Sequence, residues 1–290
     1  MSERELPLTL KDIEEKRKAK SKDSSTQKVQ NQMHPMRNVW IVLILLVLTS
    51  IYAFMSFDYG NINWSEAIAT TFANLKIIFL EADLTTITLG EALIQVLITF
   101  AIAFLTTLFS AIVSFFLGLF AAKNLGGGKT STIIKTFVAL IRSIPTVMWV
   151  LIFAIVAGLG SVAAVIGISF HSLGYLTKMF SETFEDMDEG VTEALKATGA
   201  SWWQIIFQGV LPSTIRSLSA WTFMRLEINY IIALGMGAAA GAGGIGFNLF
   251  MSGNFYYNMH EVGAITFLIL ITCVLLEAIS VKVKRSLVTK

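Results

Sequence analysis

Three polar side chains, Arg225, Glu227 and Asn229, interrupt a long apolar stretch of the sequence. At about 100° per residue of helix, Arg225 and Asn229 lie within about 40° of each other, whereas Glu227 points about 160° away from Arg225. An ionisable side chain at membrane depth is costly unless it is paired or hydrated, so each one marks a candidate functional position. A guanidinium beside a carboxamide can attract an anion. Glu227 needs a partner on another helix, for which Arg142 is a candidate.

Two roles are open for these residues. In the first, Arg225 and Asn229 line a translocation path and attract an anionic substrate weakly, because tight binding in mid-path would slow release. In the second, Arg225 and Glu227 are both structural, each tied to a neighbouring helix, and the path is merely polar. His171 has the same two roles open: a hydrogen bond between helices, or a donor to a substrate oxygen.

No catalytic or metal-binding constellation accompanies these residues. The only other histidines, His34 and His260, are far from His171 in the expected topology, so we expect no metal site. Neither the run 126–130 nor the glycine-rich run 235–246 has the full pattern of a phosphate-binding loop. We expect them to be turns, with Gly174, Gly243 and Gly244 allowing close helix or backbone packing and Pro145 kinking a helix.

The elements that hold these residues must cross a membrane. The chain is 54% hydrophobic and 14% charged, with a mean hydropathy of +0.68, whereas soluble domains are about 25% charged. About six apolar segments can span a bilayer. The expected class is therefore an all-α, polytopic membrane protein, with spans near 39–57, 92–122, 133–157, 162–180, 212–236 and 262–281.

Charge asymmetry orients these spans. With both termini in the cytoplasm, the inner segments hold seventeen Lys and Arg residues and the outer segments hold one, Lys76. We therefore expect a cytoplasmic basic arm at 1–38, a first membrane helix at 39–57 and an extracytoplasmic segment with a short surface helix at 58–91. The membrane core is expected at 92–290, with a cytoplasmic loop at 181–212.

The loop 181–212 is amphipathic although it lies between apolar spans. Gly199 should end one helix, Ser201 can cap the next, and Pro212 can open the fifth span because the first helical turn tolerates a missing donor. Glu193-Ala194-Leu195, three residues, Gly199, nine residues and Gly209-Val210-Leu211-Pro212 resemble the EAA loop of ABC importer permeases. Leu195 replaces an alanine of that pattern and Gly209 replaces an isoleucine. The resemblance implies a helix that docks on an ATPase subunit through Glu193, Ala194, Leu195, Gly199, Ala200, Gly209, Leu211 and Pro212.

Further motifs from about residue 90 onward are similar to the phosphonate-type branch of these permeases. They are Arg142-Ser143-Ile144-Pro145, His171 with Gly174 and Tyr175, Arg225-x-Glu227-x-Asn229, and the glycine run that contains Gly243 and Gly244. The resemblance implies a type I importer permease in a bacterial cytoplasmic membrane, without catalysis or a cofactor of its own. ATP and Mg would be bound by partner ATPase subunits. The other implied partners are an extracytoplasmic substrate-binding protein, a second permease subunit in a homodimer or heterodimer, and membrane lipid, but not nucleic acid.

Other functions remain open at this point. Methionine-type permeases share the Arg-Ser-Ile-Pro element, so methionine, phosphate or phosphite could replace a phosphonate as the substrate. A secondary transporter or channel is the alternative from another class. Secondary transporters often contain internal repeats, and the sequence has no clear one.

Overall fold

The computed structural model describes residues 36–58, 60 and 62–288, so most of the expected arm at 1–38 lies outside the described residues. The chain divides into two compact units, Met1–Ala67 and Ile68–Lys290. In the first unit, a helix runs over Met36–Ser56, and every side chain along it is exposed. It is uncharged apart from Arg37 and is long enough to cross a bilayer.

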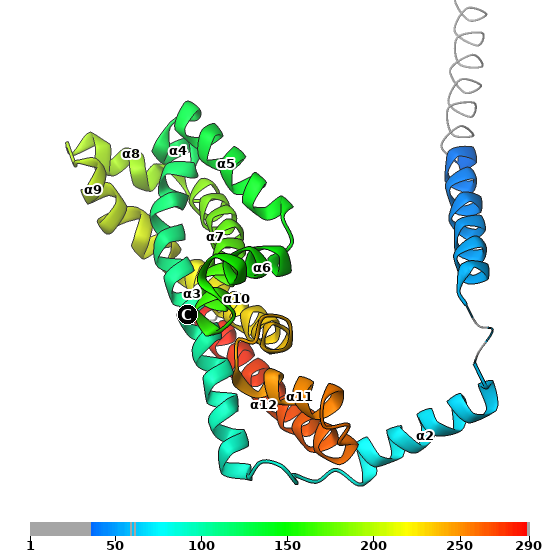
Figure 1. The fold of residues 1–290 in the computed structure, drawn as a ribbon. Helices are drawn as coiled ribbons and strands as arrows, with labels where there is room; N and C mark the ends of the chain where they lie inside the picture. The colour runs from blue at the N-terminus through cyan, green and yellow to red at the C-terminus, as the bar shows by residue number, and fades with distance from the viewer. Residues whose placement is uncertain (1–35, 59, 61, 289–290) are drawn as a thin grey trace, which may run out of the picture. The chain divides into compact units, whose positions relative to one another are not determined.

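Among its described residues, the second unit contains helices joined by loops and no strands (Figure 1). Helix α2 (Trp64–Leu80) begins in the first unit and leads through a loop to α3, which opens with a capping box between Thr88 and Glu91. The helices that follow are α3 (Leu89–Ala121), α4 (Lys123–Gly126), α5 (Gly128–Ser143), α6 (Thr146–Ala157), α7 (Ser161–Glu185), α8 (Glu189–Ala197), α9 (Trp202–Ile205), a π-turn (Ile206–Val210), α10 (Leu211–Ala240), α11 (Gly244–Asn254) and α12 (Met259–Val288).

Four of the described helices are long and apolar enough to span a membrane, and two bent helix pairs raise the number to six. The all-α, polytopic class is therefore confirmed. The expected third span was wrong in shape, because α5 and α6 meet at 85° and do not form one kinked helix. Pro145 cannot donate to the carbonyl of Ile141. The indole nitrogen of Trp149 donates to that oxygen at 3.0 Å, so the break leaves no orphaned acceptor there.

Helix α10 begins at Leu211, one residue before the expected start of the fifth span at Pro212, but no break precedes it. One helical path runs from Trp202 through the π-turn into α10 and ends at Ala240. Pro212 lies in the first turn after the π-turn. The wider π-turn relieves the contact between the proline ring and the preceding turn, so the chain need not stop there.

The core that positions the polar residues is formed by α3, α7 and α10. Ile102 of α3, Ile168 of α7 and Tyr230 of α10 are almost fully buried in one apolar cluster. Helix α6 packs closely on α7, since a Cβ at Gly167 would lie 2.5 Å from the Cα of Val150. Only glycine permits this approach, and it brings the helix after the 85° break back onto the core.

Only residues 241–243 of the glycine-rich run lie outside helices, and they form the turn between α10 and α11, which meet at 46°. Gly243 and Gly244 have φ values of 78° and 75°, which disfavour other residues. The hydroxyl of Thr99 accepts a hydrogen bond from the amide of Ile245 at 3.1 Å, and a Cβ at Gly244 would collide with that hydroxyl. The turn is thus packed directly against α3.

Candidate functional site

The loop between α7 and α10 consists of two short helices joined at a glycine. The Asp188 carboxylate caps α8 by accepting from the amide of Gly190 at 2.9 Å. Gly199 has a φ of 79°, so the helix ends where the sequence places a residue that tolerates this conformation. The amide of Ser201 donates to the Gln204 side chain at 2.7 Å and completes a capping box that starts α9.

This loop is anchored on the membrane helices by its apolar side. Ile205, Ile206 and Val210 are buried in a cluster with Phe180 and Phe184 of α7. The Trp202 ring stacks on Phe120 with centroids 5.5 Å apart, and its indole nitrogen donates to the carbonyl of Leu125. Trp202 therefore ties α9 to the end of α3 and to α4.

The outward side of α8 carries the expected contact residues. Glu193 and Ala194 are exposed, whereas Leu195 is half-buried and turns toward the π-turn. Gly199 and Pro212 are exposed, Ala200 and Leu211 are half-buried, and Gly209 is buried. The loop thus offers a short, accessible helix on a fixed base, which is a form suited to a groove in another protein.

The two positions at which this loop departs from the EAA pattern are in contact. A Cβ at Gly209 would lie 2.7 Å from Cδ1 of Leu195 and 3.2 Å from Cγ1 of Val191. The larger residue at 195 therefore occupies space that the smaller residue at 209 leaves open. This exchange preserves the packing of α8 on the π-turn.

A buried polar network joins the middle of α3, α7 and α10. The Arg225 Nε donates to the Ser172 hydroxyl at 3.0 Å, and that hydroxyl donates to Oδ1 of Asn229 at 2.9 Å. The Asn229 amide donates to the hydroxyl of Thr107 at 2.9 Å. Arg225 is 3% exposed and Asn229 is fully buried, so the structure places both on one face, as their spacing predicts.

Arg225 has only neutral partners in this network. Its Nη2 lies 3.0 Å from Nδ1 of His171, and its guanidinium carbon lies 5.2 Å from the centroid of the Tyr175 ring. Because a guanidinium can only donate, Nδ1 of His171 accepts and the neutral ring carries its proton on Nε2. None of the ion pairs among the described residues includes Arg225. A buried positive charge without a carboxylate favours an anion nearby.

Glu227 points away from the network and pairs with α12. One of its carboxylate oxygens lies 3.5 Å from Nζ of Lys284. The suggestion that Glu227 pairs with Arg142 is therefore wrong, because Lys284 fills that role. Arg142 is exposed at the end of α5, where its side-chain carbons cross Gly174 of α7. A Cβ at Gly174 would lie 2.8 Å from Cγ of Arg142, which explains the need for a glycine there.

Sequence reasoning missed several members of the network. Thr107 and Ser172 supply its hydroxyls, yet each looks ordinary in an apolar helix. Tyr175 supplies its aromatic face, and the sequence indicated it only as part of a motif. The fully buried Glu261 was also missed; it accepts from the amide of Ile87 at 3.2 Å and holds the loop before α3 to the start of α12. Its position directly before the expected span 262–281 was the only available signal.

Comparisons with known proteins add a family. Residues 114–287 match the family described as "Binding-protein-dependent transport system inner membrane component". The chain is 28% identical over 154 residues, 53% of its length, to the phosphate-import permease protein PhnE of Mycolicibacterium smegmatis, of which it covers 29%. It is 35% identical over 149 residues, 51% of its length, to the putative phosphite transport system permease protein HtxC of Stutzerimonas stutzeri, of which it covers 52%. The chain thus spans about half or less of the length of these two relatives.

Similarity also extends to methionine permeases. The chain is 27% identical over 193 residues to the probable D-methionine transport system permease protein MetI of Pasteurella multocida, which covers 62% of this chain and 87% of that protein. Among solved structures, a chain of the inward-facing MetNI methionine ABC transporter superposes with a TM-score of 0.61 at 21% identity. The match covers 69% of this chain and 99% of that one, and it shows that the two share a fold.

Proposed function

This chain belongs to the family of inner-membrane components of binding-protein-dependent transport systems, and we propose that it forms the path of an ATP-driven importer for phosphonates or a related phosphorus oxyanion. Membership places it among ABC importer permeases, which are multi-pass proteins of the inner membrane. Such permeases carry no cofactor and leave ATP hydrolysis to a separate subunit.

One observation carries the choice of an anionic substrate. The Arg225 guanidinium is buried among the neutral groups of Ser172, His171 and Tyr175. An oxyanion that passed near this cation would compensate its charge, whereas a cationic substrate would be repelled. Two relatives are named for phosphate import and phosphite transport, which agrees with a phosphorus oxyanion. Since Arg225 already makes several hydrogen bonds, the attraction is weak enough for release.

The remaining parts of the transporter follow from topology. The excess of Lys and Arg on one side supports a cytoplasmic location for both termini and for the loop 181–212. The exposed Glu193 and Ala194 on α8 then face partner ATPase subunits, which bind ATP and Mg. A substrate-binding protein docks at the opposite end, and a second permease subunit completes the path. ATP binding can drive the transport cycle only if the ATPase subunits bind the inward-open and outward-open conformations of the permease with different affinities.

Uptake measurements test the proposal directly. A strain that lacks this chain should lose ATP-dependent uptake of labelled alkylphosphonate, phosphite or phosphate, and the intact chain should restore it. The variant Arg225→Gln should restore less uptake at equal membrane abundance, because it keeps a polar side chain but removes the charge. Uptake that persists after ATP depletion but collapses with the ion gradient would instead indicate a secondary transporter.

Methionine is the second candidate substrate. The D-methionine permease relative is covered over 87% of its length, more than the phosphite relative. If the deletion strain loses only methionine uptake, the proposed role of the loop 181–212 stands. The proposed role of Arg225 in attracting an anion then fails. The same uptake experiment therefore separates the two substrates when labelled methionine is included.

A further inference from the structure

A second group of charged side chains lies outside the buried network, in a cleft between α5 and α7. The cleft has a volume of about 260 Å³ and reaches from the end of α3 along both helices. Its charged lining residues are Lys135 and Arg142 on α5, and Lys178, Glu182 and Glu185 on α7. The lining therefore holds three cations and two carboxylates. The alanine and valine side chains between them are small, so they leave the cleft open.

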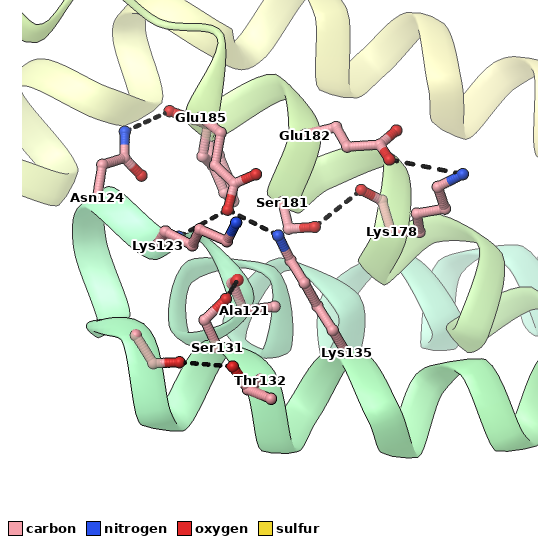
Figure 2. Close-up of polar contacts among 12 residues, drawn as sticks. Ala121, Lys123, Asn124, Ser131, Thr132, Lys135, Lys178, Ser181, Glu182 and Glu185 are labelled. Atoms are coloured by element: carbon pink, nitrogen blue, oxygen red, sulfur yellow. Dashed lines mark hydrogen bonds and ion pairs between the residues drawn. The ribbon is translucent and has the colours of Figure 1, made fainter.

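The two carboxylates of this cleft are already matched by lysines. Figure 2 shows Lys135 reaching from α5 to Glu185, whose carboxylate oxygen lies 2.7 Å from Nζ and also accepts from the amide of Lys123 at 2.7 Å. One turn earlier on α7, Nζ of Lys178 lies 3.5 Å from Glu182. Arg142 makes no ion pair with any residue in the described part of the chain. The cleft therefore keeps one uncompensated positive charge, and that charge is at Arg142.

Helical spacing sets where that charge lies. Lys135 and Arg142 are seven residues apart, so they share a face of α5 and lie about 10 Å apart along its axis. The stem of Arg142 crosses Gly174, which lies about one turn of α7 beyond His171. His171 in turn bonds Arg225. The cationic end of the cleft thus adjoins the buried network, and its neutralised end lies at the Lys123 turn.

We propose that the Arg142 end of the α5–α7 cleft binds the oxyanion group of a phosphorus compound. This deepens the proposed function and rests on it, because it gives the substrate a second site between Arg225 and the cytoplasm. A guanidinium presents paired donors that match two oxygens of a phosphate or phosphonate group. The same chemistry is offered by a free oxyanion in transit and by the headgroup of an anionic phospholipid drawn into the cleft.

Binding to the full transporter in lipid nanodiscs tests this site. The probes are radiolabelled inorganic phosphate and methylphosphonate, measured in discs of phosphatidylcholine and in discs that also contain phosphatidylglycerol. Arg142→Gln should weaken oxyanion binding about tenfold or more, because it removes a charge-assisted pair of hydrogen bonds. Arg142→Lys should fall between. Lys129→Gln is the matched control, since Lys129 is an exposed cation of α5 outside the cleft.

A second variant acts in the opposite direction. Glu182→Gln frees Lys178 from its ion pair and adds positive charge to the cleft, so oxyanion binding should become severalfold tighter. Glu182 is preferable to Glu185 for this purpose, because Glu185 also holds the backbone at Lys123. This variant keeps the test decisive if Arg142→Gln fails to fold.

The outcomes separate the sources of the oxyanion and the two proposals. Arg142-dependent binding that is equal in both lipids supports a free oxyanion, and competition by phosphatidylglycerol supports a headgroup. Unchanged binding in Arg142→Gln, or unchanged or weaker binding in Glu182→Gln, overturns the site. If the wild type transports no phosphorus compound but binds phosphate through Arg142, the proposed function fails and the site stands. If uptake is normal and Arg142→Gln alters neither uptake nor binding, the site alone fails.

Discussion

Replacing Gly209 with isoleucine should loosen the packing of α8, and adding Leu195→Ala should restore it. A Cβ at 209 would lie 2.7 Å from the Leu195 methyl group, and the further carbons of isoleucine would enter the same space. Such overpacking costs about 1–3 kcal/mol. Leu195→Ala alone removes a half-buried side chain and costs roughly 1 kcal/mol. Because the two residues touch, the double variant should recover about 1–2 kcal/mol relative to the sum of the single variants.

The assay is thermal unfolding of the purified permease, together with ATP-dependent uptake at matched abundance. The matched control is Gly235→Ile, because Gly235 also lies in a helix but a Cβ there would meet no atom within 4 Å. Gly209→Ile should lower both the unfolding temperature and uptake, and the double variant should raise both. If the loss in the double variant equals the sum of the losses in the two single variants, the reasoning is refuted. Such additivity would show that positions 195 and 209 do not compensate each other.

Two further predictions concern the helix breaks. Gly244→Ala should destabilise the protein more than Gly243→Ala: both have positive φ, which costs about 1–2 kcal/mol, but only Gly244 also meets Thr99. Unfolding temperatures of the two variants check the order, and equal losses would contradict a role for the α3 contact. Trp149→Phe should cost about 1 kcal/mol, because the Ile141 carbonyl loses the indole donor at the α5–α6 break. A Trp40→Phe variant in the exposed first helix serves as the control, and equal stability of both variants would argue against that hydrogen bond.

The sequence predicted the class of fold and the angular relations within each helix. Arg225 and Asn229 share a network while Glu227 does not, because side-chain direction along one helix depends only on spacing. The partner of Glu227 could not be predicted in this way. Lys284 is distant in the sequence, and only the packing of α12 against α10 brings the two charges together.

Break positions were predictable, but their geometry was not. Pro145 marks where α5 ends, yet the 85° angle also depends on Trp149 and on the close approach at Gly167. The hydroxyl groups of the network could not be predicted for a related reason. Thr107 bonds the carbonyl four residues earlier, as many threonines in membrane helices do, and its second bond to Asn229 depends on the tertiary contact.

The unbroken path from Trp202 to Ala240 places α9 and the buried Arg225 on one continuous helix. Arg225 lies thirteen residues beyond Pro212, which corresponds to about 20 Å of helix. A tilt of about 10° around the π-turn would carry Arg225 sideways by about 3.5 Å at that lever length. Its bonds to Ser172 and His171 are each 3.0 Å long, and a displacement of that size breaks both. A tilt of α9 at the π-turn would therefore free the Arg225 charge from its partners on α7.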